Sequence, residues 1–359
     1  MDGKNYCVIM AGGIGSRFWP MSKQKKPKQF IDVLGVNKSL LQLTFERMTK
    51  IFNAENILIV TSESYRHLVI EQLKGIKEGN ILCEPNRRNT APCIAYANYK
   101  IRKDNKDANI VVVPSDHVIE NEDLFLKTIE KGLVAAEQED ILITLGIRPS
   151  YPNTGYGYVQ YIEKEYCNND KDIKKVKLFA EKPVLEMAEK FIKSGDFLWN
   201  AGIFIWNIRS IDKAMKTYCK EIYEAFQQEK NMKEEDFITN AYLSCPSVSI
   251  DYAVMERADN VYVIPSDFGW SDVGTWKALY GIGKQDENKN RITGRNVMTY
   301  DTQNCIVNMP KDKLVVLQGL DDYIVVENDN ILMICKKSEE QRIRQFVTDV
   351  EVEKGNQYI

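Results

Sequence analysis

The first 150 residues alternate between short apolar runs and longer segments that predict helices. The apolar runs lie at residues 6–10, 56–61, 81–85, 109–114 and 141–146. Polar residues do not alternate with apolar ones inside these runs, so we expect strands that are buried on both faces. Predicted helices begin near Glu63, Thr90 and Asp123, between the strands. This order favours an α/β fold with a mainly parallel sheet covered on both sides.

Three glycines, Gly12, Gly13 and Gly15, follow the first predicted strand. Glycine has no Cβ, so the backbone turns sharply here and its N–H groups approach a ligand closely. Such loops bind phosphate, and Arg17 and Lys28 add positive charge to this one. Ligands of parallel sheets lie beyond the carboxyl ends of the strands. The stretch therefore predicts a nucleotide-phosphate loop.

A dinucleotide-binding fold also begins with a strand, glycines and a helix, in the spacing G-x-G-x-x-G. Here Phe18 occupies the place of the third glycine, and Pro20 and Pro27 interrupt any helix directly after the loop. These features disfavour a dehydrogenase. The other alternative, a turn that binds no ligand, does not account for a long basic loop with two prolines.

The composition excludes several classes of protein. A net charge of −3 argues against a general basic surface for nucleic acid. No apolar run approaches the roughly 20 residues that span a bilayer, and the first residues lack a signal-peptide pattern. We therefore expect a cytoplasmic protein with no membrane or nucleic-acid partner. The 8 cysteines form no C-x-x-C pair and predict buried, reduced thiols, while 2 histidines offer little for a His-based site.

The later part of the chain predicts two further regions. Residues 151–284 are less regular, with helical patterns at 185–193 and 211–230, and are expected to extend the first sheet. From residue 285 a polar linker leads into short β-type runs separated by turn residues. These runs predict a small all-β domain, such as a few coils of a β-solenoid. The predicted domains are residues 1–284 and 285–359.

Two aspartates are candidate magnesium ligands. Asp116 directly follows the most hydrophobic predicted strand, where a carboxylate is well placed to hold Mg²⁺ between nucleotide phosphates. Asp272 lies between Trp270 and Gly274, in a loop where packing gives little reason for a carboxylate. The alternative for both residues is helix capping, a common role for aspartate.

Other polar residues allow two interpretations each. Lys182, beside Pro183, is either a phosphate ligand or an ordinary solvated lysine. Asn200 lies in an apolar run and must be hydrogen-bonded, either to backbone or to a ligand such as a sugar hydroxyl. Arg88, Asn89 and Thr90 either recognise a base or cap the helix that follows, and capping is the simpler interpretation for Asn89 or Thr90.

Further motifs follow the glycine loop along the chain. They are Trp19-Pro20, Pro27-Lys28-Gln29-Phe30, Glu84-Pro85, Arg88-Asn89-Thr90-Ala91-Pro92, Pro114-Ser115-Asp116-His117, Gly155-Tyr156-Gly157-Tyr158, Glu181-Lys182-Pro183, Trp199-Asn200-Ala201-Gly202-Ile203-Phe204, Ser249-Ile250-Asp251 and Trp270-Ser271-Asp272-Val273-Gly274. In this order the sequence closely resembles the mannose-1-phosphate guanylyltransferases (GDP-mannose pyrophosphorylases), a sugar nucleotidyltransferase family. Trp-Pro after the arginine and Arg-Asn-Thr-Ala-Pro are fairly specific to the guanylyl branch.

The resemblance implies a fold and a reaction. The fold is an α/β nucleotidyltransferase of the glycosyltransferase-A-like type, with a Rossmann-like sheet and a small C-terminal, left-handed β-helix-like domain. The reaction transfers GMP from GTP to α-D-mannose 1-phosphate and gives GDP-mannose and diphosphate, with Mg²⁺ as cofactor. Some relatives carry a second, cupin-type isomerase domain; because this sequence ends at Ile359, we expect the transferase activity alone.

The resemblance also implies a role for each matched residue. Nucleotide binding is assigned to Ala11, Gly12, Gly13, Gly15, Arg17, Lys28, Glu84, Asn89, Thr90, Ser115 and Asp116. Sugar-phosphate binding is assigned to Gly155, Tyr156, Gly157, Glu181, Lys182, Asn200 and Asp251. The catalytic set is Arg17, Lys28, Asp116, Lys182 and Asp272, of which Asp116 and Asp272 hold the metal.

Two other hypotheses stay open. In the first hypothesis, the substrate of the same scaffold is another sugar 1-phosphate, such as a heptose or glucose phosphate, or another nucleotide. Alternatively, the chain is a regulatory homologue that binds sugar nucleotide without turnover, although a degenerate copy would be free to lose some of its charged residues. The small β domain has little core of its own, so we expect it to pack on the first domain or on the second subunit of a homodimer.

Overall fold

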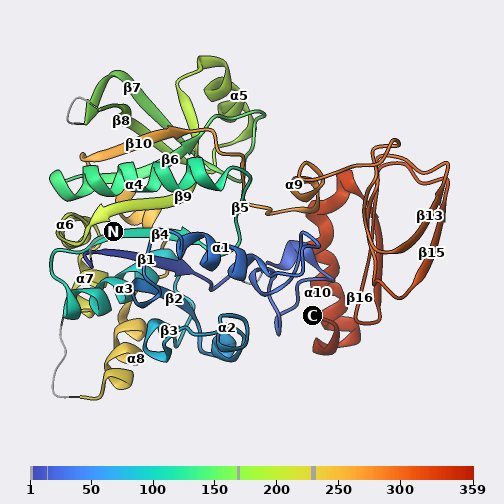
Figure 1. Ribbon diagram of the computed structural model, residues 1–359, viewed down its shortest axis with the longest axis horizontal. Helices are drawn as coiled ribbons and strands as arrows, with labels where there is room; N and C mark the ends of the chain where they lie inside the picture. The colour runs from blue at the N-terminus through green and yellow to red at the C-terminus, as the bar shows by residue number, and fades with distance from the viewer. Residues whose placement is uncertain (1–2, 14, 168–169, 228–231) are drawn as a thin grey trace. The chain divides into compact units, whose positions relative to one another are not determined.

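The computed structural model describes residues 3–13, 15–167, 170–227 and 232–359 (Figure 1). The chain divides into two compact units, and each unit gathers segments that are far apart in the sequence. The first unit comprises residues up to 12, 44–115 and 119–270. The second unit comprises residues 13–43, 116–118 and 271–359. The predicted domain boundary after residue 284 stays a prediction.

A large sheet forms the centre of the first unit. Among the described residues it has nine strands in the order β3-β2-β1-β4-β9-β6-β10-β8-β7. The strands are β1 (Asn5–Met10), β2 (Ile57–Ser62), β3 (Ile81–Glu84), β4 (Asn109–Pro114), β6 (Leu142–Ile147), β7 (Gly157–Cys167), β8 (Asp170–Glu181), β9 (Phe197–Asn207) and β10 (Val261–Ser266). Strand β9 is antiparallel to β4 and β6, and β8 is antiparallel to β7 and β10, whereas the β1, β2, β3 and β4 neighbours pair in parallel. The prediction of a mainly parallel sheet is confirmed, with two reversed strands that it did not include.

The helices begin close to where the sequence predicts them. They are α1 (Leu40–Met48), α2 (Arg66–Gln72), α3 (Thr90–Asp104), α4 (Glu122–Gln138), α5 (Leu185–Ser194), α6 (Ile208–Tyr218), α7 (Lys220–Ala225), α8 (Glu234–Ser244), α9 (Trp276–Tyr280) and α10 (Ile343–Lys354). The helix predicted at 211–230 is instead divided between α6 and α7 at Cys219, and positions 228–230 lie outside the described residues. No helix in the described chain is long and apolar enough to cross a membrane.

Helices cover both faces of the large sheet. On β9, Phe204 and Trp206 belong to one apolar cluster with Ile94 of α3. Ile205, which lies between them in the sequence, points to the opposite face, because successive strand side chains alternate. There it meets α4 so closely that a Cβ on Gly132 would lie 2.5 Å from Ile205 Cδ1. This close approach explains why α4 carries glycine at residue 132.

The second unit contains a small β structure of stacked strands. Its strands are β12 (Arg291–Thr293), β13 (Asn296–Tyr300), β14 (Ile306–Asn308), β15 (Leu314–Gln318), β16 (Tyr323–Asn328) and β17 (Ile331–Lys336). Strands β12, β14 and β16 pair in parallel on one side, and β13 pairs in parallel with β15 on another. Such parallel pairing between successive turns of chain is typical of a solenoid. Strand β17 then turns back antiparallel to β16, and α10 follows it.

From residue 13 onward, the loop after the first strand belongs to the second unit. Phe18 and Trp19 share an apolar cluster with Trp276 of α9, Ile324 of β16 and Ile343 of α10. The Trp19 indole Nε1 also donates a hydrogen bond of 2.8 Å to the backbone oxygen of Tyr358. Residues near both ends of the sequence therefore build one core.

The cysteines agree with the expectation of reduced thiols. All 8 lie within the described residues, and none forms a disulfide. Cys7 of β1 is fully buried, and burial raises the pKa of its thiol far above the ordinary value. Six of the 8 are buried and act as small apolar core residues, whereas Cys83 and Cys219 are partly exposed.

Candidate functional site

The glycine loop brings Lys28 into the interior of the second unit. Gly15 has a backbone φ of +64°, and a Cβ at this position would lie 2.6 Å from the Cβ of Lys28. Both the left-handed conformation and the close approach therefore require glycine. Lys28 begins a short helical turn, and only 3% of its surface is exposed. The loop thus encloses a charged side chain that would ordinarily lie in solvent.

The Lys28 ammonium binds three oxygen atoms of its own unit. Its Nζ lies 2.8 Å from Asp116 Oδ2 and donates hydrogen bonds of 2.8 and 3.0 Å to the backbone oxygens of Asp272 and Val273. An ammonium has three donors, so these contacts satisfy it. Burial alone would raise the pKa of Asp116, but the charges of Lys28 and His117 outweigh it and hold the pKa below its ordinary value. Asp116 is therefore ionised at neutral pH.

A cavity of about 250 Å³, which we call the charged pocket, lies beside Lys28 in the second unit. Its lining residues are Gly15, Ser16, Arg17, Phe18, Lys28, Asp116, His117, Asp272, Gly274 and Arg344. Arg17 donates a long hydrogen bond of 3.4 Å to the backbone oxygen of Gly274, and the Asp272 carboxylate accepts one of 2.9 Å from Gly274 N. Four of the five predicted catalytic residues thus line one pocket.

The two aspartates of the charged pocket fit the chemistry of a magnesium site. Mg²⁺ is usually held by one or two carboxylates together with waters and substrate phosphates. Asp116 and Asp272 supply two carboxylates at one cavity. Within the described ranges, no group of three or more His, Cys, Asp or Glu side chains is arranged to hold a metal ion. A magnesium ion held by the two carboxylates would take its other ligands from water and substrate phosphate.

The remaining predicted residues of the first loops lie outside the lining of this pocket. Ala11 N donates to Val60 O at 2.7 Å, and Ala11 O accepts from the Thr61 hydroxyl at 2.9 Å. Gly13 O accepts a hydrogen bond of 2.9 Å from the Gln29 amide. Ser115 is buried, and its N–H donates to Met10 O at 3.0 Å. These contacts hold the loops in shape.

A buried carboxylate, Glu84, lies at the end of β3 in the first unit. Its exposed fraction is 5%, and the Tyr242 hydroxyl donates a 3.0 Å hydrogen bond to Glu84 Oε1. Burial raises the pKa of Glu84 to about 7, although the hydrogen bond from Tyr242 opposes this shift. A Cβ on Gly12 would lie 3.1 Å from Glu84 Oε2, so the first glycine of the loop passes close to this carboxylate.

Asn89 has the capping role that the simpler interpretation gives it, whereas the Thr90 hydroxyl contacts another segment. The Asn89 side chain accepts a hydrogen bond of 2.9 Å from Thr90 N, at the N-terminus of α3. Thr90 Oγ1 accepts a hydrogen bond of 2.9 Å from Ile250 N, which fixes the segment that leads to Asp251. Whether either residue also contacts a base stays a prediction.

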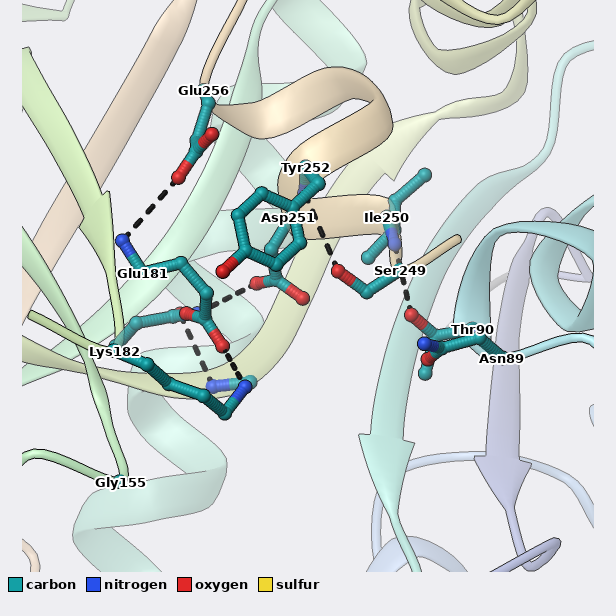
Figure 2. A network of polar contacts seen from close by, with 12 residues as sticks. Asn89, Thr90, Gly155, Glu181, Lys182, Ser249, Ile250, Asp251, Tyr252 and Glu256 are labelled. Carbon is teal, nitrogen blue, oxygen red and sulfur yellow. Dashed lines mark hydrogen bonds and ion pairs between the residues drawn. The ribbon is translucent and has the colours of Figure 1, made fainter. Parts of the chain in front are cut away.

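A second group of polar residues surrounds Asp251 in the first unit (Figure 2). Asn200 of β9 donates a 2.8 Å hydrogen bond from Nδ2 to Asp251 Oδ1. Asn200 Oδ1 accepts hydrogen bonds from the Thr144 hydroxyl at 2.7 Å and from Gly202 N at 3.1 Å. Burial and the nearby charge of Glu181 raise the pKa of Asp251 to about 6. The Asn200 amide is thus held in one orientation, with its donor toward the carboxylate.

Glu181 and Lys182 lie at the end of β8, next to Asp251 (Figure 2). Lys182 Nζ forms an ion pair with Glu181 Oε1. The Lys182 side chain is 57% exposed, and its backbone φ is +48°, an unusual value for a lysine. Glu181 N donates a 3.3 Å hydrogen bond to Glu256 Oε1. The structure therefore brings Glu181, Lys182, Asn200 and Asp251 together.

The three predicted residues of the 155–157 loop differ in their surroundings. Gly157 lies against the Glu181 carboxylate: a Cβ there would be 2.4 Å from Glu181 Oε2, so a larger residue would make that carboxylate shift. Tyr156 makes edge-to-face ring contacts with Trp199 and Trp270, with centroids 5.1 and 5.3 Å apart. Gly155 N donates a hydrogen bond of 2.8 Å to Asn153 Oδ1.

Sequence patterns did not identify several residues that contact these groups. Thr144, Tyr242 and Glu256 lie outside the matched motifs, and only the fold brings them to Asn200, Glu84 and Glu181. Arg344 lies in a helix after the β strands, about 70 residues after the last matched motif. A charged residue at a helix end has no local signal that separates a ligand contact from solvent exposure.

The chain is similar to several known proteins over most of its length. Residues 6–289 match the family model described as nucleotidyl transferase, and residues 294–350 match the MannoseP isomerase/GMP-like beta-helix domain. A mannose-1-phosphate guanylyltransferase of Salmonella montevideo is 36% identical, covering 98% of this chain and 75% of that relative. Mannose-1-phosphate guanylyltransferase 2 of Escherichia coli O157:H7 is 35% identical, covering 100% of this chain and 76% of that relative.

A solved structure from Thermus thermophilus, described as a mannose-1-phosphate geranyltransferase, superposes with a TM-score of 0.87 at 28% identity. The match covers 97% of this chain and 99% of the Thermus chain. The fold is that of a nucleotidyltransferase, and the chain belongs to the nucleotidyl transferase family. Within it, the chain belongs to the mannose-1-phosphate guanylyltransferases.

Proposed function

We propose that this enzyme transfers GMP from GTP to α-D-mannose 1-phosphate. A phosphate oxygen of the sugar phosphate attacks the α-phosphorus of GTP in line. The bond between that phosphorus and the α–β bridging oxygen breaks, and diphosphate leaves with the electron pair. GDP-mannose is the second product. The nucleophile is already an anion, so the reaction requires no general base and no covalent enzyme intermediate.

The charged pocket is the observation that carries this proposal. Arg17 and Lys28 lie at one cavity with two carboxylates, beside a loop whose glycine admits close backbone approach. Phosphoryl-type transfers depend mainly on alignment and on neutralisation of phosphate charge. Arg17 would bind phosphate oxygens, and the buried Lys28 would supply positive charge and hold Asp116 in place. Mg²⁺ on Asp116 and Asp272 would neutralise phosphate charge when bound.

The group around Asp251 supports recognition of the sugar phosphate. Glu181, Asp251 and Asn200 offer acceptors and donors of the kind that sugar hydroxyls require. Lys182 is exposed and carries a compact charge, which suits the phosphate of mannose 1-phosphate. Because Gly157 has no side chain, the Glu181 carboxylate has room beside it for its own movement or for a ligand.

Glu84 supports a preference for guanine. Guanine presents two N–H donors on its Watson–Crick edge, and an ionised carboxylate accepts both. Glu84 is buried, and Tyr242 orients one of its oxygens. The pair would discriminate against bases that lack this donor pattern, because a buried carboxylate without partners is costly.

We also propose that the enzyme is a cytoplasmic homodimer that binds neither membranes nor nucleic acid. The solenoid strands β13 and β15 expose apolar side chains, among them Met298 (47%), Leu314 (70%) and Val316 (57%). A second copy of the chain would cover this surface. The molar mass measured by light scattering over a range of concentrations tests the dimer, and a constant monomer mass would contradict it.

A substrate panel tests the proposed reaction. The protein is incubated with Mg²⁺, each of the four nucleoside triphosphates and a set of sugar 1-phosphates, and diphosphate release is measured. We expect the fastest release with GTP and mannose 1-phosphate, and release at least about a hundredfold slower from Asp116→Asn and Asp272→Asn. Faster diphosphate release with a heptose or glucose phosphate would show that mannose 1-phosphate is not the preferred substrate. No release from any pair would favour the regulatory alternative.

A further inference from the structure

Arg344 is the second residue of α10, the helix that follows the solenoid strands (Figure 1, red). The preceding residue, Ile343, is fully buried in the cluster that contains Phe18 of the glycine-loop segment. Phe346 and Val347 pack against the same cluster. The beginning of α10 is therefore fixed by core packing to the segment that carries Arg17, and the Arg344 side chain lines the charged pocket.

The cations of this pocket differ in how they are satisfied. Lys28 is bound to three oxygens of the protein, and Arg17 donates to Gly274 O. The Arg344 guanidinium, in contrast, forms no ion pair and no hydrogen bond with any described residue, although it lies at a cavity with two carboxylates. Its five donors are therefore available to a ligand.

The nearby Arg342 shows what a structural arginine does on the same helix end. It forms an ion pair with Glu339 at 3.4 Å and lies over the Phe346 ring at 5.5 Å. Arg342 is absent from the lining of the charged pocket. The two arginines thus have the same charge and nearly the same place in the chain, but only Arg344 faces the cavity.

The size and charge of the cavity favour phosphate groups as its occupant. Its volume of about 250 Å³ is below the roughly 300–1,000 Å³ of pockets that enclose a whole drug-sized ligand. Three cationic side chains, Arg17, Lys28 and Arg344, lie at its wall. Guanidinium groups bind phosphate through paired, charge-assisted hydrogen bonds. An anion of two linked phosphates suits such a site.

We propose that Arg344 binds the β- and γ-phosphates of the nucleoside triphosphate, which leave as diphosphate. The inference rests on the proposed function, and it gives the C-terminal helix a direct part in the reaction. Arg344 would hold the leaving group in line and stabilise the negative charge that develops on it when the bond to the α-phosphorus breaks. The helix that follows the solenoid would then be required for turnover as well as for stability.

Binding to unreacting ligands tests this inference. Calorimetric titrations of GTP, GMP and inorganic diphosphate are compared for wild type, Arg344→Ala, Arg344→Lys and the control Arg342→Ala. For Arg344→Ala we expect affinities for GTP and diphosphate to fall at least about tenfold and that for GMP to change by less than about twofold. Arg344→Lys should restore part of the lost affinity, because lysine keeps the positive charge but cannot form the paired hydrogen bonds of a guanidinium. Arg342→Ala should bind like wild type.

If Arg344→Ala binds GTP and diphosphate within about twofold of wild type, or loses GMP affinity by the same factor, Arg344 does not contact the leaving phosphates. Thermal melting of each variant reports folding, and alanine is compatible with a helix at this position. Turnover of a different nucleotide or sugar would contradict the proposed function alone, because diphosphate binding depends on neither the base nor the sugar.

Discussion

Glu84 and Asp251 are two carboxylates that folding removes from water. Burial raises the pKa of Glu84 to about 7 and that of Asp251 to about 6. A raised carboxyl pKa means that folding disfavours the ionised form. Neither ionised group therefore adds to stability. Their positions beside Gly12 and Asn200 favour a binding role instead.

The protonation of Glu84 should make the free energy of unfolding depend on pH. The ordinary pKa is 4.5 and the folded value is about 7, so the folded state binds the proton more tightly. The contribution of protonated Glu84 to the free energy of unfolding is thus fully present below pH 4.5 and is lost as the pH rises through 7. Glu84→Gln cannot ionise, so we expect equal stability at about pH 4 and a gain of about 1–3 kcal/mol at about pH 8. Urea unfolding at both pH values measures this difference.

The same variant separates stability from function. Gln keeps the shape and still accepts from Tyr242, but it does not offer guanine the two acceptors of an ionised carboxylate. We therefore expect the KM for GTP to rise at least about tenfold while the protein becomes more stable at about pH 8. A variant that is less stable than wild type at this pH would show that ionised Glu84 is stabilised by groups other than Tyr242.

A second prediction assigns Tyr242 to the orientation of Glu84. Its hydroxyl donates to Glu84 Oε1 and lowers the carboxyl pKa, so Tyr242→Phe should raise that pKa further. We expect the pH below which GTP binding weakens to move upward, with a KM for GTP about threefold to tenfold higher at about pH 7. Tyr300→Phe, on the exposed face of β13, is the control. Identical pH profiles for Tyr242→Phe and wild type would refute the assignment.

A third prediction concerns Thr144, which fixes the Asn200 amide from inside the sheet. Thr144 is fully buried and its hydroxyl lies 2.7 Å from Asn200 Oδ1. Thr144→Val removes this donor with little change in volume, and we expect kcat/KM for mannose 1-phosphate to fall about tenfold with the KM for GTP unchanged. Thr144→Ser keeps the hydroxyl and should stay near wild type. Equal losses in both variants would indicate a packing defect instead.

Single residues were predictable from the sequence where they belong to a local motif, but not where their role depends on contacts with distant segments. Arg17, Lys28, Asp116 and Asp272 belong to motifs, and the structure places all four at one pocket. The contact between Lys28 and Asp116 joins two loops that are far apart in sequence, and its pairing follows only from the fold. Arg344 and Tyr242 lie in helices with ordinary helical patterns, so no local feature distinguished them.

At the scale of elements, the glycine loop depends on one backbone conformation. Gly15 has φ +64° and its Cβ position is blocked by Lys28, whereas Gly13 has open space around its Cβ position. We expect Gly15→Ala to lose about 1–3 kcal/mol of stability, and Gly13→Ala to change stability by less than about 0.5 kcal/mol. Chemical denaturation measures both. Equal stabilities for the two variants would mean that the loop adapts to a side chain at residue 15.

Strands and helices were predicted well where their signals are local. The apolar runs of β1, β2, β3, β4 and β6 and the start of α3 coincide with the observed elements. The reversed strand β9, between β4 and β6, was not predicted, because an apolar run does not encode direction. The break between α6 and α7 was also missed, since both helices continue one apolar pattern.

At the scale of the whole molecule, the composition of the two units was not predictable from the sequence. The second unit takes its glycine-loop segment, residues 13–43, from the first part of the chain. Its core joins Phe18 and Trp19 to the solenoid strand β16 and to α10. A composition change near residue 285 marks where the β strands begin, but it says nothing of which earlier segment packs on them.

We propose that this architecture performs nucleotidyl transfer from GTP to mannose 1-phosphate. Phosphorus NMR follows the reaction directly, because substrates and products have distinct signals. With Mg²⁺ present, we predict that GDP-mannose and diphosphate appear in equal amounts as GTP and mannose 1-phosphate disappear. Formation of GDP with inorganic phosphate, or an unchanged spectrum with folded protein, would contradict the account.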